Sequence, residues 1–131
     1  RVRDVLAAVR CLRDELGFQE ITVEAEGRAG IWALHAAVLD ESIRELVIHN
    51  CLWAYEMVMR EPEYVQPHLA EIPRSALLEY DLPHLCAAIA PQRLTVSSPQ
   101  NARGEAIDLT GRDDYRMVME AHAATESLSL E

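Results

Sequence analysis

Two β-type segments on either side of one helical segment place the strongest limit on the fold of this chain. Residues 21–25 and 43–48 are short runs rich in β-branched side chains, and residues 30–39 between them carry apolar side chains at helical spacing. Two strands joined through a helix form a parallel βαβ unit. The chain is therefore predicted to build a parallel sheet.

The remaining segments continue this alternation of helices and strands. Residues 2–16 repeat apolar side chains at three- and four-residue steps before Gly17, which predicts an amphipathic helix with a glycine C-cap. Residues 53–80 contain three prolines, and an irregular excursion of short helices is expected there. Further on we expect a helix over 83–90, a strand over 93–97, a polar loop over 98–111, a helix over 112–124 and a strand over 127–130. Residues 1–131 are interpreted as one α/β domain or part of one, with a parallel sheet and helices on both faces.

The charge balance argues against two classes of partner. The 131 residues carry a net charge of −10, and the 12 basic residues, all arginine, are scattered along the chain. Such a chain repels nucleic acid and anionic lipid surfaces. The apolar content of 50% suffices for a core, but no run reaches the ~18 apolar residues of a membrane span. Neither nucleic acid nor a membrane is expected as a partner.

The cysteines show the pattern of small core residues. Cys11, Cys51 and Cys86 are odd in number, widely spaced and embedded in apolar runs. Buried, unpaired thiols are therefore expected, and a disulfide framework is not. The histidines do not have the spacing of a metal motif. No metal site and no other cofactor are predicted.

The segment between the first strand and the next helix has the shape of a nucleophile elbow. In the G-x-S-x-G motif, small residues flank a nucleophilic serine because strand and helix nearly touch at the turn. Here the five positions read Ala25-Glu26-Gly27-Arg28-Ala29. Small residues remain at both flanks, but the central glycine has no side chain that attacks a carbonyl. The turn is therefore predicted to persist without its nucleophile.

Four stretches of the chain carry a family resemblance. They are DVLAAVRCLRDELG before the elbow strand, VEAEGRAGIWALHAAVLD across the elbow, IRELVIHN after it, and YDLPHLCAAIAPQRLTVSSPQNARGEA further on. These stretches resemble the acetyl xylan esterase and dienelactone-hydrolase-like branch of the α/β-hydrolase superfamily, and most of all a degenerate second hydrolase domain. The resemblance implies the carboxyl-terminal half of an α/β-hydrolase fold, which belongs to a larger protein.

The resemblance also implies where the hydrolase residues fall. The nucleophilic serine falls at Gly27, and the oxyanion-hole amide that follows it falls at Arg28. The acid falls at Asn101, which forms hydrogen bonds but cannot stabilise an imidazolium with a full negative charge. The family's histidine would come after Glu131. We therefore expect a non-catalytic module without catalytic residues of its own.

Two other functions stay open at this point. The chain could be part of an active carbohydrate esterase that another segment completes, with an unorthodox nucleophile such as Cys51 beside His49, or Ser97. It could instead bind a glycan or acyl ligand at the carboxyl edge of the sheet, through Arg28 and His49. Trp32, Trp53 and Tyr55 would suit a sugar-binding surface, although a tryptophan at the start of a packed helix is more often a core residue.

Association with other segments is expected through the first strand. In the family's sheet the strand over residues 21–25 is central, between the strand over 43–48 and a strand from a preceding half. Here that second edge is unpaired, and the run has no Lys or Pro to protect it. The chain is therefore expected to pack against the remainder of a hydrolase domain or an adjacent esterase domain, or to associate with itself through this strand.

Overall fold

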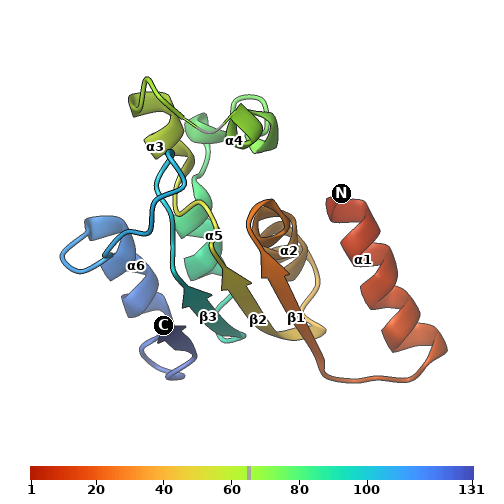
Figure 1. Cartoon of the computed structure of the whole chain (residues 1–131). Helices are drawn as coiled ribbons and strands as arrows, with labels where there is room; N and C mark the ends of the chain where they lie inside the picture. Colours follow the sequence, from red (N-terminus) through yellow and green to blue (C-terminus); the bar gives the residue numbers. More distant parts are fainter. Residues whose placement is uncertain (65) are drawn as a thin grey trace.

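The computed structural model, which describes residues 1–64 and 66–131 and all of their side chains except those of 66–68, contains one parallel β-sheet (Figure 1). Its strands are β1 (Ile21–Glu26), β2 (Ile43–His49), β3 (Arg93–Ser97) and β4 (Leu128–Leu130). They lie in the order β1-β2-β3-β4, and each pairs in parallel with the next. The expected parallel α/β fold is confirmed.

Helices connect and flank these strands. They are α1 (Val2–Arg10), continued by the wider turn η1 (Cys11–Glu15), α2 (Arg28–Leu39), α3 (Tyr55–Arg60), α4 (Gln66–Glu71), the 3-10 turn η2 (Ala76–Leu78), α5 (Leu82–Ala88) and α6 (Asp113–His122). The short elements α3, α4 and η2 occupy the irregular excursion that the prolines predict. No described helix is both long enough and apolar enough to cross a membrane.

One face of the sheet is apolar and lies under the helices. The register places Val23 of β1 beside Leu46 of β2 and Leu94 of β3 on this face, with Ile48 beside Val96 one step further on. These side chains of β2 and β3 are at most 4% exposed. α2 contacts β1, β2, α1 and α5, and α6 packs on α5. The core therefore lies between the sheet and a single layer of helices.

The opposite face carries polar side chains that bond across the strands. Glu45 Oε2 accepts from Thr22 Oγ1 (3.2 Å) and from Arg93 Nη2 (3.1 Å), and His49 Nε2 lies 3.0 Å from Glu24 Oε1. Because βαβ crossovers are right-handed, a strand order that advances in one direction places every connecting helix on the same face. In the described part of the chain, the helices therefore cover one face of the sheet and not both faces as expected.

Cys11 is exposed, which corrects the expectation that all three cysteines are buried. Its neighbours Val9 and Leu12 both pack toward the core. Successive residues of a helix point in different directions, and Cys11 falls on the outer side between these two apolar positions. Cys51 and Cys86 are buried, as expected.

Candidate functional site

The turn from β1 to α2 has the backbone geometry of an elbow. Gly27 adopts φ 57° and ψ −127°, a conformation that glycine reaches freely and that strains other residues. Its N–H donates to the His49 carbonyl (2.8 Å), and its carbonyl accepts from the Gly30 N–H (3.1 Å). A β-carbon added at Gly27 would meet no described atom within 4 Å. The chain thus turns sharply from strand to helix and presents residue 27 in open space.

Close packing behind the turn explains why small residues are needed there. A β-carbon at Gly30 would lie 3.0 Å from Cys51 Sγ and 3.2 Å from Cys51 Cβ. Cys51 itself is 4% exposed, and burial raises the pKa of its thiol to about 12. Since a thiol attacks as the thiolate, Cys51 is held in an unreactive form at neutral pH. It serves as a packing residue of the elbow.

Arg28, the expected ligand-binding cation, pairs with a carboxylate of the same chain. Its Nη1 lies 3.4 Å from Glu71 Oε1 at the end of α4, and the Arg28 side chain is 50% exposed. The other Glu71 oxygen accepts from Trp32 Nε1, and the Glu71 side chain is 13% exposed. The Tyr55 hydroxyl donates to the Glu71 carbonyl (3.2 Å). Glu71 therefore ties the excursion to the amino end of α2.

His49 lies at the carboxyl end of β2, on the polar face of the sheet. Its ring contacts Glu24, and the next residue, Asn50, donates through Nδ2 to Glu26 Oε1 (3.0 Å). Cys51, only two residues further on, is buried behind the elbow. The side chains of His49 and Cys51 therefore do not form a nucleophile and base pair.

Asn101, at the expected acid position, uses its side chain within its own loop. Its Oδ1 accepts from the N–H groups of Arg103 (2.9 Å) and Glu105 (3.1 Å), and its Nδ2 donates to Glu105 Oε2 (2.9 Å). The Gly104 N–H donates to the Asn101 carbonyl (3.1 Å). These bonds make Asn101 the organiser of a tight turn, a role that asparagine side chains commonly fill.

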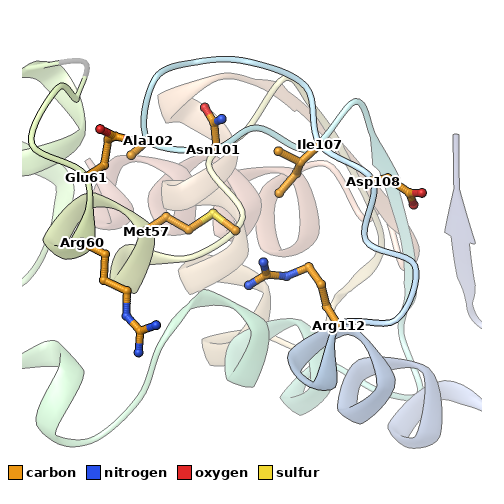
Figure 2. Close-up of a pocket in the computed structure, with 8 residues that line it drawn as sticks. All are labelled: Met57, Arg60, Glu61, Asn101, Ala102, Ile107, Asp108 and Arg112. Carbon is orange, nitrogen blue, oxygen red and sulfur yellow. The ribbon is translucent and has the colours of Figure 1, made fainter.

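A pocket of about 500 Å³ lies beside Asn101, between the end of α3, the loop after β3 and the start of α6 (Figure 2). It is lined by Met57, Arg60, Glu61, Asn101, Ala102, Ile107, Asp108 and Arg112. The Arg112 guanidinium extends toward Met57 in Figure 2, but it is bound in a bidentate pair to Asp114 (2.7 and 3.0 Å). Arg60 is likewise paired, with Glu56. The cations of this pocket are therefore already neutralised.

The positions inferred from the hydrolase resemblance and the candidate ligand residue His49 do not share this pocket. Asn101 lines this pocket, whereas Gly27, Arg28 and His49 do not. A serine hydrolase needs its nucleophile, base and acid within hydrogen-bond reach of one another. Among the described residues, the carboxyl edge of the sheet offers an elbow without such a constellation.

The aromatic residues considered for sugar binding divide between core and surface. Trp53 is 3% exposed and Tyr55 is fully buried. The Trp53 ring stands edge-on to Tyr115, with centroids 6.1 Å apart. Trp32 is partly buried and is held by Glu71. Trp53 and Tyr55 are core residues, which agrees with the more common role of such side chains.

Asp81 is a buried carboxylate that was not predicted from the sequence. Its Oδ1 accepts from the N–H groups of Tyr55 (2.6 Å) and Leu82 (2.6 Å), and its Oδ2 accepts from the Glu56 N–H (3.0 Å). The Asp81 N–H in turn donates to His84 Nδ1 (3.0 Å). One side chain therefore caps the starts of both α3 and α5. An acidic residue just before the Leu-Pro start of α5 was the available signal, but it indicated only the local cap.

His122 is the second buried polar residue that the sequence analysis missed. It is 1% exposed at the end of α6, with Nε2 2.8 Å from the Cys86 carbonyl and Nδ1 2.6 Å from Ser127 Oγ. A carbonyl only accepts, so His122 Nε2 carries a proton and donates to Cys86. The Ser127 hydroxyl also lies 2.6 Å from Thr125 Oγ1. Ser127 is 5% exposed. The pair therefore links α6, α5 and the start of β4 inside the core. The side chain of a further histidine, His68, lies outside the described residues.

Comparison with known proteins adds no assignment to this geometry. A scan against protein-family models found no matching family, and a search of curated proteins found no match. The elbow, its surroundings and the edges of the sheet are therefore the features that bear on function.

The burial of the cysteines predicts how their thiols react. Cys11 is exposed, whereas burial raises the pKa of Cys51 to about 12 and raises that of Cys86 as well. In the native protein at mildly alkaline pH, we expect only Cys11 to react rapidly with Ellman's reagent, and all three thiols to react in guanidinium. The Cys11→Ser variant serves as the control and should show no rapid phase. A second rapid thiol in the native protein would contradict the packing of the elbow.

Proposed function

We propose that this chain is a non-catalytic α/β-hydrolase-like module associated with a carbohydrate esterase-type protein, of the acetyl xylan esterase kind. The observation that carries the proposal is the elbow at Gly27. Strand, sharp turn and helix have the arrangement that presents a nucleophile, but the residue presented has no side chain. The chain would retain the scaffold of the site after losing its chemistry.

The surroundings of the elbow support this proposal. The side chain at the oxyanion position, Arg28, is bound to Glu71, and Asn101 at the acid position is bound within its own turn. Neither side chain is directed to a reacting group at residue 27. A module of this kind acts by packing against, or regulating, an active esterase domain in the same polypeptide or complex.

An ester assay with the elbow variant tests the proposal. We expect the purified chain to show no turnover of para-nitrophenyl acetate above the buffer rate, and Gly27→Ser to leave this unchanged. A serine hydroxyl without a base and an oriented acid is a weak nucleophile. The substitution fits sterically, but its positive φ should lower the free energy of unfolding by about 1 kcal/mol.

The controls separate the proposal from its enzymatic rival. Cys51→Ala and Ser97→Ala remove the unorthodox nucleophiles at this edge of the sheet, and an active serine esterase shows that the assay detects turnover. Rapid turnover by the Gly27→Ser variant would show that a base lies within reach of residue 27. Turnover by the unmodified chain above the buffer rate would contradict the non-catalytic assignment, and its loss in one of the alanine variants would identify the nucleophile.

A further inference from the structure

The edge of β1 that faces away from β2 is unpaired in the described part of the chain. β1 is first in the strand order. Its bonds to β2 begin with the Ile21 N–H donating to Ser42 and continue to the Gly27 N–H donating to His49. Because backbone direction alternates along a strand, Thr22, Glu24 and Glu26 point their N–H and C=O groups away from β2. This edge therefore offers a row of hydrogen-bonding groups to another strand.

Apolar side chains lie along the same edge on the helix side of the sheet. In the view of Figure 1, α1 lies on the side of β1 away from β2, and it packs against α2. Several side chains of α1, including Val5 and Leu6, are only partly buried, and Leu16 and Phe18 between α1 and β1 are 62% and 54% exposed. A strand that pairs with β1 would bury its helix-facing side chains against these residues. The helix-facing positions of such a strand should therefore be apolar.

The opposite face of this edge is acidic. Glu24 and Glu26 project there from β1, and the Glu24 side chain is 73% exposed. Among the described residues, their side-chain hydrogen-bond partners are the His49 ring and the Asn50 amide, neither of which is a permanent cation. Opposite charges on neighbouring strands stabilise their pairing, and like charges directly opposite each other destabilise it. The open face of the partner strand should therefore be basic.

The same acidic residues disfavour a second copy of this chain. A symmetric antiparallel pair centred on Glu24 places the two copies of Glu24 directly opposite each other. Centred on Ala25, the pair places Glu24 opposite Glu26. Each of these registers brings carboxylates together on the open face. Self-association through β1 is therefore the weaker of the two expected modes.

We propose that the free edge of β1 docks a β-strand of another polypeptide segment, with apolar side chains toward α1 and Lys or Arg side chains beside Glu24 and Glu26. This proposal adds the chemistry of the partner strand to the proposed function. Only the biological role of the partner, an associated esterase domain, rests on the proposed function. Backbone pairing supplies the affinity, and the two alternating sets of side chains supply the specificity.

Two synthetic peptides and one charge-reversal variant test the proposal. One peptide alternates valine with lysine and the other alternates valine with glutamate, and both carry a fluorophore for anisotropy titration against the intact chain. We expect the lysine peptide to bind at least about tenfold more tightly than the glutamate peptide, with an affinity that falls as salt rises. The double variant Glu24→Arg and Glu26→Arg should reverse this preference, whereas the same substitutions at the exposed Glu79 and Glu120 should not.

Hydrogen exchange and sedimentation locate the binding and identify the occupant. Bound lysine peptide should slow amide exchange at Thr22, Glu24 and Glu26. Equal binding of both peptides, or binding without slower exchange at these amides, would overturn the proposal. So would a concentration-dependent dimer at neutral pH with protected β1 amides, since the occupant would then be a second copy. Ester turnover is measured separately, so failure of the docking site and failure of the non-catalytic assignment are distinguishable.

Discussion

Replacing Asp81 with alanine should lower the free energy of unfolding by about 3 to 5 kcal/mol. The carboxylate is 8% exposed and accepts from three backbone N–H groups, those of Tyr55, Glu56 and Leu82. Alanine leaves all three donors without this acceptor at the starts of two helices. Chemical denaturation followed by circular dichroism measures the loss directly.

Two variants provide the controls for Asp81. Asp81→Asn keeps one oxygen for Tyr55 and Leu82 but turns an amide toward the Glu56 N–H, so it should cost about 1 to 2 kcal/mol. Asp113→Ala removes a carboxylate from the start of α6 whose side chain is 92% exposed, and its cost should stay within about 0.5 kcal/mol. A loss at Asp81→Ala no larger than at Asp113→Ala would mean that the shared cap does not hold the two helices.

His122→Ala should cost about 3 kcal/mol or more, because it combines a cavity with two broken hydrogen bonds. The ring is 1% exposed and bonds to the Cys86 carbonyl and the Ser127 hydroxyl. Its loss separates the end of α6 from α5 and from the start of β4. Besides the lower stability, we expect faster amide exchange at Ser129 and Glu131, where the last strand adjoins β3.

A substitution at Ser127 measures how much of the stability loss at His122 comes from the hydrogen bond between the two side chains. Ser127→Ala leaves the ring and its bond to Cys86 in place, so it should cost only about 1 to 2 kcal/mol. In a double-mutant cycle the two substitutions should be non-additive by about 1 kcal/mol, because they remove the same bond. Additive losses would show that the close approach of His122 Nδ1 and Ser127 Oγ contributes no coupling energy.

These two polar clusters also bear on the proposed role of the chain. Asp81 stabilises the excursion at the carboxyl end of the sheet, and His122 stabilises the side of the sheet away from β1. Glu71 adds a third internal tie, between α4 and the elbow helix. The side chain of each of these residues forms hydrogen bonds that connect elements of the fold. This leaves the free edge of β1 as the feature best suited to a partner, in agreement with a module that associates and does not catalyse.

Local sequence patterns predicted the order and type of the secondary structure elements. The strand predicted over 93–97 matches β3 (Arg93–Ser97), and the helix predicted over 112–124 differs from α6 (Asp113–His122) by one residue at the start and two at the end. Periodicity suffices for this because each side chain's direction follows from the elements' repeats of 3.6 and 2 residues. The elbow was predictable for a similar reason, since Gly27 is the residue type that a positive φ favours most.

The hydrogen bonds and ion pairs of the site residues join segments that are far apart in the sequence. Arg28 meets Glu71 across 43 residues, and His122 meets the Cys86 carbonyl across 36. A hydrophobic pattern records which face of an element is buried but not which neighbour supplies a hydrogen-bond partner. Whether Arg28 was available to a ligand was therefore decided only when α4 packed against α2.

Which face of the sheet the helices cover was also determined partly by the sequence and partly by the tertiary structure. Alternating residues such as Val23 and Glu24 already distinguish an apolar from a polar side of β1. The strand order β1-β2-β3-β4 advances in one direction, and because crossovers in parallel sheets are right-handed, this order places the connecting helices on one face. The same order places β1 at an edge of the described sheet. Local periodicity could not predict this, because strand pairing joins residues that are far apart in the sequence.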